Sequence, residues 1–127
     1  MSMKLDLDLA HNRCPSALNP LDHLKSEGKR GRGVFAALDL GTNNCRLLVA
    51  RGLGRGFRVI DAFSRIVRLG EGLAASGALS EVAMARTIEA LKVCADKIDH
   101  REVTSGRYVA TEACRRAANC AEFLERV

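Results

Sequence analysis

The sequence VFAALDLGTNNCRLLVA occupies residues 34–50 and decides the fold of this chain. Residues 34–38 form a short apolar run, which predicts a buried strand ending at the turn Asp39-Leu40-Gly41. Residues 45–50 are again apolar and compatible with a β-strand. Only a short polar link separates these two apolar runs. The segment therefore predicts two neighbouring strands joined by a turn that contains the polar residues.

A third strand and a long helix are predicted after these two strands. Three glycines between residues 52 and 56 mark a flexible turn, and the alternating pattern over 57–67 predicts the third strand. Three strands joined by short links indicate an antiparallel meander. Ser80 is the predicted N-cap of a helix over about 81–99. Its apolar stripe, with spacings of 4, 3, 4 and 3, consists of Met84, Ile88, Leu91, Ala95 and Ile98.

The C-terminal part completes the predicted order of elements. Residues 107–111 predict a fourth strand, which runs directly into a helix-forming segment at 112–118. Residues 121–127 form a further helical stretch. The order is therefore strand, strand, strand, helix, strand, helix, and it predicts an α/β fold.

Composition excludes several classes of protein. The chain has 127 residues, of which 47% are apolar and 28% charged, as expected for a globular domain. No apolar run approaches the ~20 residues of a membrane span, and no secretory signal is expected at the N-terminus. Five cysteines, an odd number without a CxxC pair, predict reduced thiols and a cytoplasmic location. We expect four of them to fill the core, namely Cys45, Cys94, Cys114 and Cys120.

The charge of the chain predicts an anionic partner. Its net charge is +5, and fifteen of its twenty basic residues are arginines, which suit bidentate contacts to phosphate or carboxylate. Aromatic residues make up only 4% of the chain, which argues against base stacking and hence against a nucleic-acid partner. Residues 1–33 contain both prolines and a basic run at 29–33, and we interpret them as a flexible N-terminal extension.

The link between the first two predicted strands carries the chemistry. Gly41 lets the backbone adopt a positive φ and approach a ligand, and successive N–H groups of such a turn can bind an anion. Thr42 and Asn43 add neutral donors, and Arg46 adds charge. Asp39 could hold Mg²⁺ or orient a water molecule. The alternative is an ordinary polar turn in which Asp39 and Asn43 bond only the local backbone.

The pattern D-[IL]-G-[ST]-N between two strands resembles the phosphate-1 loop of the actin-like ATPase and sugar-kinase superfamily. Together with VRLGEGLAASGALSEVAMARTIEAL and VATEACRRAANCAEFLERV, it resembles one branch in particular, the Ppx/GppA family of exopolyphosphatases and guanosine pentaphosphate phosphohydrolases. The resemblance covers about residues 35–127. It implies a ribonuclease H-like domain, of which residues 34–127 would be the N-terminal part of the first phosphatase domain.

The resemblance also implies a phosphate site. The phosphate-binding residues would be Gly41, Thr42, Asn43, Arg46, Arg68, Thr111 and Arg115. Asp39 would hold Mg²⁺ as the cofactor. Asn44, Glu112 and Arg116 depart from the usual family pattern, which leaves the roles of Glu112 and Arg116 open.

The family's proposed catalytic glutamate and its second glycine-rich loop, D-[IL]-G-G-G-S, would lie beyond Val127. We therefore expect an N-terminal fragment of a homodimeric enzyme, with no catalytic residue in this chain and with half of a phosphate site. The implied activity is release of terminal phosphate from inorganic polyphosphate or guanosine pentaphosphate. Two alternatives stay open, namely an ATP-dependent phosphotransferase of the same superfamily and a non-catalytic polyanion-binding module.

Overall fold

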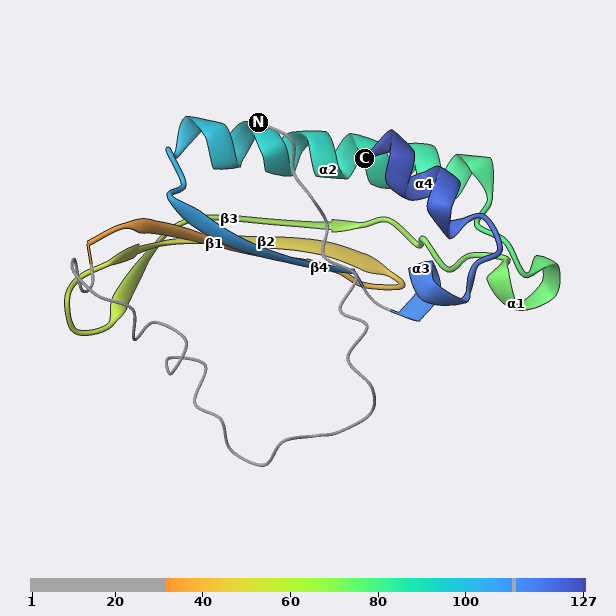
Figure 1. The fold of residues 1–127 in the computed structure, drawn as a ribbon, viewed down its shortest axis with the longest axis horizontal. Helices are drawn as coiled ribbons and strands as arrows, with labels where there is room; N and C mark the ends of the chain where they lie inside the picture. Colours follow the sequence, from red (N-terminus) through yellow and green to blue (C-terminus); the bar gives the residue numbers. More distant parts are fainter. Residues whose placement is uncertain (1–31, 111) are drawn as a thin grey trace, which may run out of the picture.

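A computed structural model describes residues 32–110 and 112–127, which form a four-stranded sheet with helices packed on one face (Figure 1). The elements in chain order are β1 Val34–Leu40, β2 Asn44–Gly52, β3 Phe57–Ile66, α1 Leu73–Ser76, α2 Glu81–His100, β4 Ser105–Ala110, α3 Glu112–Arg116 and α4 Cys120–Arg126. Residues 1–31 lie outside the described part of the chain, so the predicted flexible extension stays a prediction.

The strands lie in the order β3-β2-β1-β4. β1 and β2 pair antiparallel, as do β2 and β3, which confirms the predicted meander. β4 pairs parallel with β1, and α2 forms the connection that carries the chain from β3 to that distant edge. The pairing of Leu40 with Cys45 extends both strands to the short turn between them.

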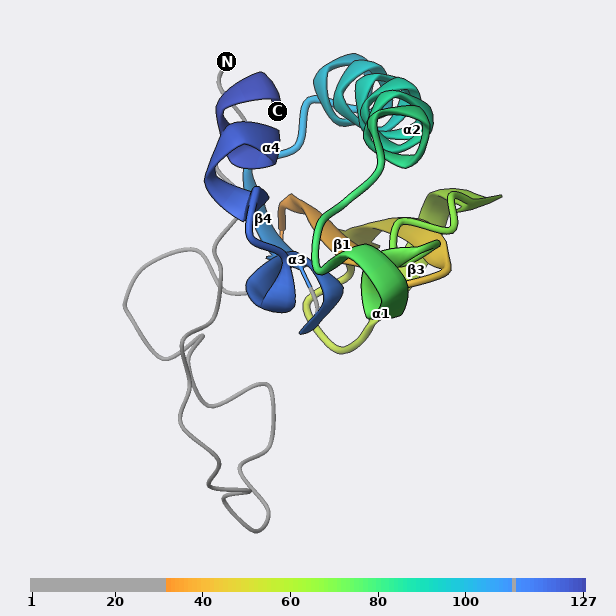
Figure 2. The same ribbon diagram turned by 90° about the vertical axis from the view of Figure 1, so that its right-hand side faces the viewer.

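Alternating burial along the strands explains why one face of the sheet forms the core. In β1, Val34, Ala36, Leu38 and Leu40 are buried, while Ala37 and Asp39 between them are exposed. This is the period of two expected for a strand with one covered face. Figure 2 shows α2 and α4 side by side over that buried face, with α1 and α3 at one end of the sheet. No helix among the described residues covers the opposite face.

The long helix α2 begins where the sequence predicts. The Ser80 hydroxyl accepts a hydrogen bond from the Ala83 N–H at 3.2 Å, so Ser80 is the N-cap. Ile88 and Ala95 of the predicted apolar stripe are only partly buried. The face of α2 that packs against the sheet therefore differs slightly from the predicted stripe. The buried residues of α2 are Ala83, Met84, Thr87, Ala90, Leu91, Cys94 and Ile98.

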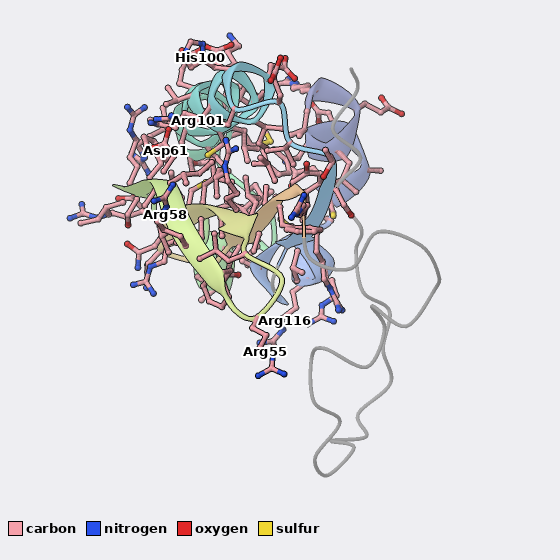
Figure 3. All side chains as sticks on the ribbon, turned by 90° about the vertical axis from the view of Figure 1, so that its left-hand side faces the viewer. Arg55, Arg58, Asp61, His100, Arg101 and Arg116 are labelled. Atoms are coloured by element: carbon pink, nitrogen blue, oxygen red, sulfur yellow. The ribbon has the colours of Figure 1, made fainter. Side chains whose placement is uncertain are left out.

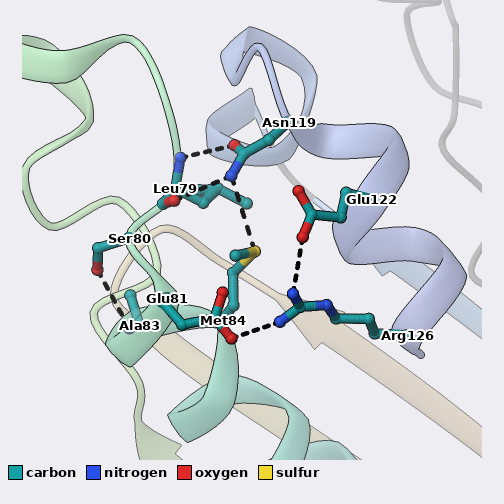
Figure 4. A network of polar contacts seen from close by, with 8 residues as sticks. All are labelled: Leu79, Ser80, Glu81, Ala83, Met84, Asn119, Glu122 and Arg126. Atoms are coloured by element: carbon teal, nitrogen blue, oxygen red, sulfur yellow. Dashed lines mark hydrogen bonds and ion pairs between the residues drawn. The ribbon is translucent and has the colours of Figure 1, made fainter.

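Polar contacts join the start of α2 to the C-terminal helix α4 (Figure 4). The Asn119 side chain accepts a hydrogen bond from the Leu79 N–H at 2.8 Å and donates to the Leu79 carbonyl at 3.0 Å. The Arg126 guanidinium lies between two carboxylates, at 2.5 Å from Glu81 and 2.7 Å from Glu122. These contacts hold α4 beside α2, so that both helices cover the same face of the sheet.

The one-turn helix α1 is absent from the predicted order of elements. It spans only four residues between Gly72 and Gly77, whose φ angles are 78° and 71°. Both glycines adopt left-handed conformations and flank a single helical turn. The predicted helix over 112–118 is also shorter than expected and ends at Arg116.

The four cysteines of the described residues lie in the core or pack against it, as predicted. Cys45, Cys94 and Cys114 are buried, Cys120 is partly buried, and all four are free thiols. The sulfur atoms of Cys45 on β2 and Cys94 on α2 lie 3.9 Å apart. Burial raises the pKa of Cys114 to about 11, so its thiol stays protonated near neutral pH.

Within the described residues, no helix combines the length and apolarity needed to cross a membrane.

A carboxylate on β3 fixes the far end of α2. Asp61 accepts hydrogen bonds from Lys97 at 2.9 Å and from Arg101 at 3.0 Å, and its side chain is only 14% exposed. Figure 3 shows Asp61 and Arg101 close together between the edge strand and the helix. The Lys97 ammonium and the Arg101 guanidinium lower the pKa of Asp61 to about 2.

We expect the free energy of unfolding to depend less on pH under acidic conditions when Asp61 is replaced by asparagine. A lowered pKa in the folded state means that the charged carboxylate contributes to stability above its ordinary pKa of about 3.9. That contribution disappears as the pH falls toward 2. Urea unfolding at a series of pH values should therefore show a smaller loss of stability between pH 4.5 and 2 for Asp61→Asn than for the wild type. Equal losses would contradict the ion-pair assignment.

Candidate phosphate-binding site

The turn between β1 and β2 is short and is closed by a backbone hydrogen bond between its two ends. The Gly41 N–H donates to the Asn44 carbonyl at 2.8 Å, and a Cβ added to Gly41 would lie 3.2 Å from that same oxygen. Glycine is therefore favoured here by close backbone approach. The predicted positive φ of Gly41 is wrong, because the positive-φ glycines of the described residues are Gly54, Gly56, Gly72 and Gly77.

A second segment, the connection that follows β3, is bonded to this turn. The Asn43 carbonyl accepts hydrogen bonds from the N–H groups of Val67 at 2.7 Å and Arg68 at 3.0 Å. The Thr42 carbonyl accepts from the Gly70 N–H at 3.0 Å. By contrast, the N–H groups of Thr42 and Asn43 donate to no backbone carbonyl in the described part of the chain. Two adjacent donors at a turn are what an anion-binding backbone concavity requires.

The third segment, α3, meets the first two at Gly70. A Cβ at Gly70 would lie 2.3 Å from the Thr42 methyl carbon and 3.8 Å from the Ala113 Cβ. Beside this contact is a hollow of about 540 Å³, which we call the loop hollow. It is lined by Thr42, Gly70, Leu73, Ala74, Gly77, Ala113 and Arg116. The three sequence segments that carry the family resemblance therefore converge in space.

Arg68 has an unusual backbone conformation for a side chain of its size. Its φ is +48°, in the left-handed region that residues other than glycine rarely adopt. The side chain is exposed, and it makes no hydrogen bond or ion pair with another described residue. Strained residues of this kind persist where the surrounding structure holds them, and they concentrate at functional sites.

Asp39 and Arg46 lie elsewhere, on the uncovered face of the sheet. They are directly opposite each other in the β1–β2 register, and both are exposed. They contribute to a second hollow of about 590 Å³, the sheet-face hollow, whose other walls are mostly apolar. Its lining residues are Ala37, Leu38, Asp39, Arg46, Leu47, Leu48, Phe63, Ser64, Arg107 and Val109. Of the predicted site residues, Asp39 and Arg46 therefore line the sheet-face hollow and Thr42 lines the loop hollow. The others among the described residues line neither hollow, namely Gly41, Asn43, Arg68 and Arg115.

The arginine of α3 that lines the loop hollow is Arg116, which the sequence left without a role. Arg116 is exposed, and Figure 3 shows its side chain at the surface of the molecule. Arg116 follows Ala113 by three residues, and this spacing places two side chains on one face of a helix. Applying that spacing to Ala113 could have identified Arg116. Arg115 is exposed on the same helix, and Thr111 lies outside the described residues.

Asp39 is the carboxylate that the sequence predicts as a Mg²⁺ ligand beside the β1–β2 turn. Within residues 32–110 and 112–127, no group of three or more His, Cys, Asp or Glu side chains could hold a metal ion. Magnesium commonly binds through one or two carboxylates together with substrate phosphates and water. Asp39, two residues before Gly41, therefore fits a Mg²⁺ ion shared with a phosphate ligand and does not fit a site built from protein ligands alone.

Comparison with known proteins identifies the family. A sequence profile of the Ppx/GppA phosphatase family matches residues 48–127, which include the connection after β3 and all of α3. This chain belongs to the Ppx/GppA phosphatase family. The match contains the second and third of the three sequence segments, and family membership confirms the resemblance. The first segment, residues 39–50, lies mostly before the matched residues.

Solved Ppx/GppA structures share the fold. A family member from Aquifex aeolicus matches with a TM-score of 0.72 and 38% identity, over 75% of this chain and 31% of that chain. An exopolyphosphatase from Cytophaga hutchinsonii matches with a TM-score of 0.69 and 26% identity, over 73% of this chain and 30% of that chain. The predicted α/β fold is confirmed, and this chain spans less than a third of the length of these two solved proteins.

Proposed function

We propose that this Ppx/GppA chain binds the terminal phosphates of a polyanionic phosphoanhydride, either inorganic polyphosphate or guanosine pentaphosphate. The observation that carries the proposal is the junction at Gly70, where the β1–β2 turn, the connection after β3 and α3 meet beside one hollow. Membership of a phosphatase family supports hydrolysis of the terminal phosphoanhydride as the reaction of the complete site.

The residues at this junction supply the donors that a phosphate needs. The N–H groups of Thr42 and Asn43, which donate to no backbone carbonyl of the described residues, would bind phosphoryl oxygens, as backbone nests do. The Arg68 guanidinium would bind the same group through its planar fork. Asp39 lies outside this junction, on the uncovered face of the sheet, and would hold a Mg²⁺ ion that neutralises further phosphate charge. Phosphoryl transfer depends mainly on such positioning and electrostatic stabilisation.

We propose that this chain alone binds phosphate with little turnover. No Asp or Glu of the described residues lines the loop hollow, so no carboxylate there stands ready to take a proton from an attacking water molecule. Glu71, the acidic residue closest in sequence to Gly70, is paired with Arg86 at 2.9 Å. We therefore infer that general-base catalysis comes from residues other than those described here.

Replacement of Arg68 by alanine should weaken the binding of tripolyphosphate to the 127-residue chain. Loss of a charge-assisted hydrogen bond costs about 1.5–3 kcal/mol, which corresponds to a loss of roughly tenfold or more in affinity. Isothermal titration calorimetry in the presence of Mg²⁺ measures this loss. The matched control is Arg58→Ala, an exposed arginine labelled in Figure 3. It is the second residue of β3, whereas Arg68 follows the other end of that strand at Ile66.

The proposal fails if Arg68→Ala and Arg58→Ala bind tripolyphosphate as tightly as the wild type. The same samples also test the proposed lack of turnover. Phosphate release from long-chain polyphosphate or guanosine pentaphosphate, at rates typical of an enzyme, would show that this chain contains a complete catalytic site.

A further inference from the structure

We propose that Arg86 on α2 is a positioning residue for Arg68, an inference that rests on the proposed phosphate-binding function. Neither the sequence motifs nor the family comparison assigns Arg86 a role. It lies 18 residues after Arg68 in the chain, yet its guanidinium contacts the backbone on both sides of that residue.

The contacts of Arg86 bracket Arg68. Its Nε donates to the Val67 carbonyl at 2.6 Å, and its Nη2 makes a longer contact of 3.4 Å with the Arg68 carbonyl. The same Nη2 donates to Glu71 at 2.9 Å. These acceptors precede, belong to and follow Arg68, so one guanidinium fixes the whole turn. A lysine ammonium has no planar fork with which to span them.

The amide side of Arg68 is held by the other loop. Both the Val67 and the Arg68 N–H groups donate to the Asn43 carbonyl. Arg68 therefore sits between the β1–β2 turn, which holds its N–H, and Arg86, which holds its carbonyl. A non-glycine residue at a φ of +48° needs this kind of restraint from two directions.

Arg86 acts through Arg68 because its Nε and Nη2 donors are already bonded to the turn and to Glu71. Its side chain is 34% exposed, and the Glu71 carboxylate neutralises its charge. The Arg68 side chain, by contrast, makes no hydrogen bond or ion pair within the described residues. Arg86 thus sets the backbone conformation that directs Arg68, while Arg68 itself contacts the phosphate.

A double-mutant cycle on tripolyphosphate affinity tests this inference. We expect Arg86→Ala to weaken binding by roughly tenfold, about as much as Arg68→Ala, because either change removes the oriented guanidinium. In the Arg68→Ala background, Arg86→Ala should produce no further loss. Calorimetric titration of the four proteins at one salt concentration gives the coupling between the two residues.

A matched control separates positioning from general stabilisation. Arg126→Ala removes another helical arginine of similar exposure, 38%, which bridges Glu81 and Glu122 at the α2–α4 contact. It should leave tripolyphosphate affinity unchanged. Arg86→Lys keeps the charge and should bind as weakly as Arg86→Ala, since a lysine ammonium cannot bracket the turn.

The outcomes distinguish this inference from the proposed function. If Arg68→Ala weakens binding and Arg86→Ala does not, the positioning role of Arg86 is wrong and the phosphate site stands. The positioning role would also be overturned if Arg86→Ala reduced tripolyphosphate affinity equally in the wild-type protein and in the Arg68→Ala variant. If Arg68→Ala leaves the affinity unchanged, the proposed phosphate-binding role itself is wrong.

Discussion

Replacement of Phe123 by alanine should lower the free energy of unfolding by about 3–5 kcal/mol, the range for large aromatic side chains in cores. Phe123 is completely buried and is the largest such side chain of the described residues. It lies on α4, which covers the same face of the sheet as α2. Truncation removes apolar burial and leaves a cavity, since close-packed surroundings relax only in part. Urea unfolding followed by circular dichroism measures the change.

The same substitution at an exposed site provides the control. Phe57, the first residue of β3, is 67% exposed, so Phe57→Ala should change stability by no more than about 0.5 kcal/mol. The free energy of unfolding of a natural domain is only about 5–15 kcal/mol in total, so Phe123→Ala removes a large share of it. If the two variants unfold at the same urea concentration, α4 does not pack on the sheet as described.

The fold was predictable where one face of an element is buried along its whole length. The apolar residues of β1 alternate with exposed ones up to Leu40, and this pattern is visible without a structure. Ser80 marks the start of α2 because capping is a local interaction between neighbouring residues. Local interactions leave a local signal in the sequence.

Elements determined by distant partners were not predictable in the same way. β4 begins at Ser105, two residues before the predicted start, because its parallel pairing reaches back to Phe35 of β1. Neither Ser105 nor Gly106 favours a strand by its own propensity. α1 was missed because a single turn is too short to show a helical period.

In the candidate site, too, features that depend on neighbouring residues were predictable and features that depend on distant residues were not. Its turn at 41–43 was predicted from residue types, since glycine and small polar residues are typical of phosphate loops. The position of Asp39 and Arg46 on the uncovered face follows from strand alternation once the sheet is known. The role proposed for Arg86 depends on two carbonyl oxygens 18 and 19 residues earlier in the chain, and no sequence pattern reports where a carbonyl points.

Replacement of Gly70 by alanine should both destabilise the chain and weaken tripolyphosphate binding. The added Cβ would lie 2.3 Å from the Thr42 methyl carbon, far closer than two carbon atoms can approach. Threonine is β-branched and stiff about χ1, so the methyl group cannot easily rotate away. Forced overpacking of this kind costs about 1–3 kcal/mol. Unfolding in urea and calorimetric titration of tripolyphosphate measure the two losses.

Thr42→Ser provides the test of cause, because it removes the clashing methyl group and keeps the hydroxyl. Alone, Thr42→Ser should leave tripolyphosphate affinity near the wild-type value. Combined with Gly70→Ala, it should restore most of the lost affinity and stability, since the Thr42 Cβ lies 3.7 Å from the added carbon, an ordinary contact. Such a rescue is non-additive, as expected only for residues in direct contact. If the double variant binds no better than Gly70→Ala, the close approach of Thr42 and Gly70 is not what holds the two loops together.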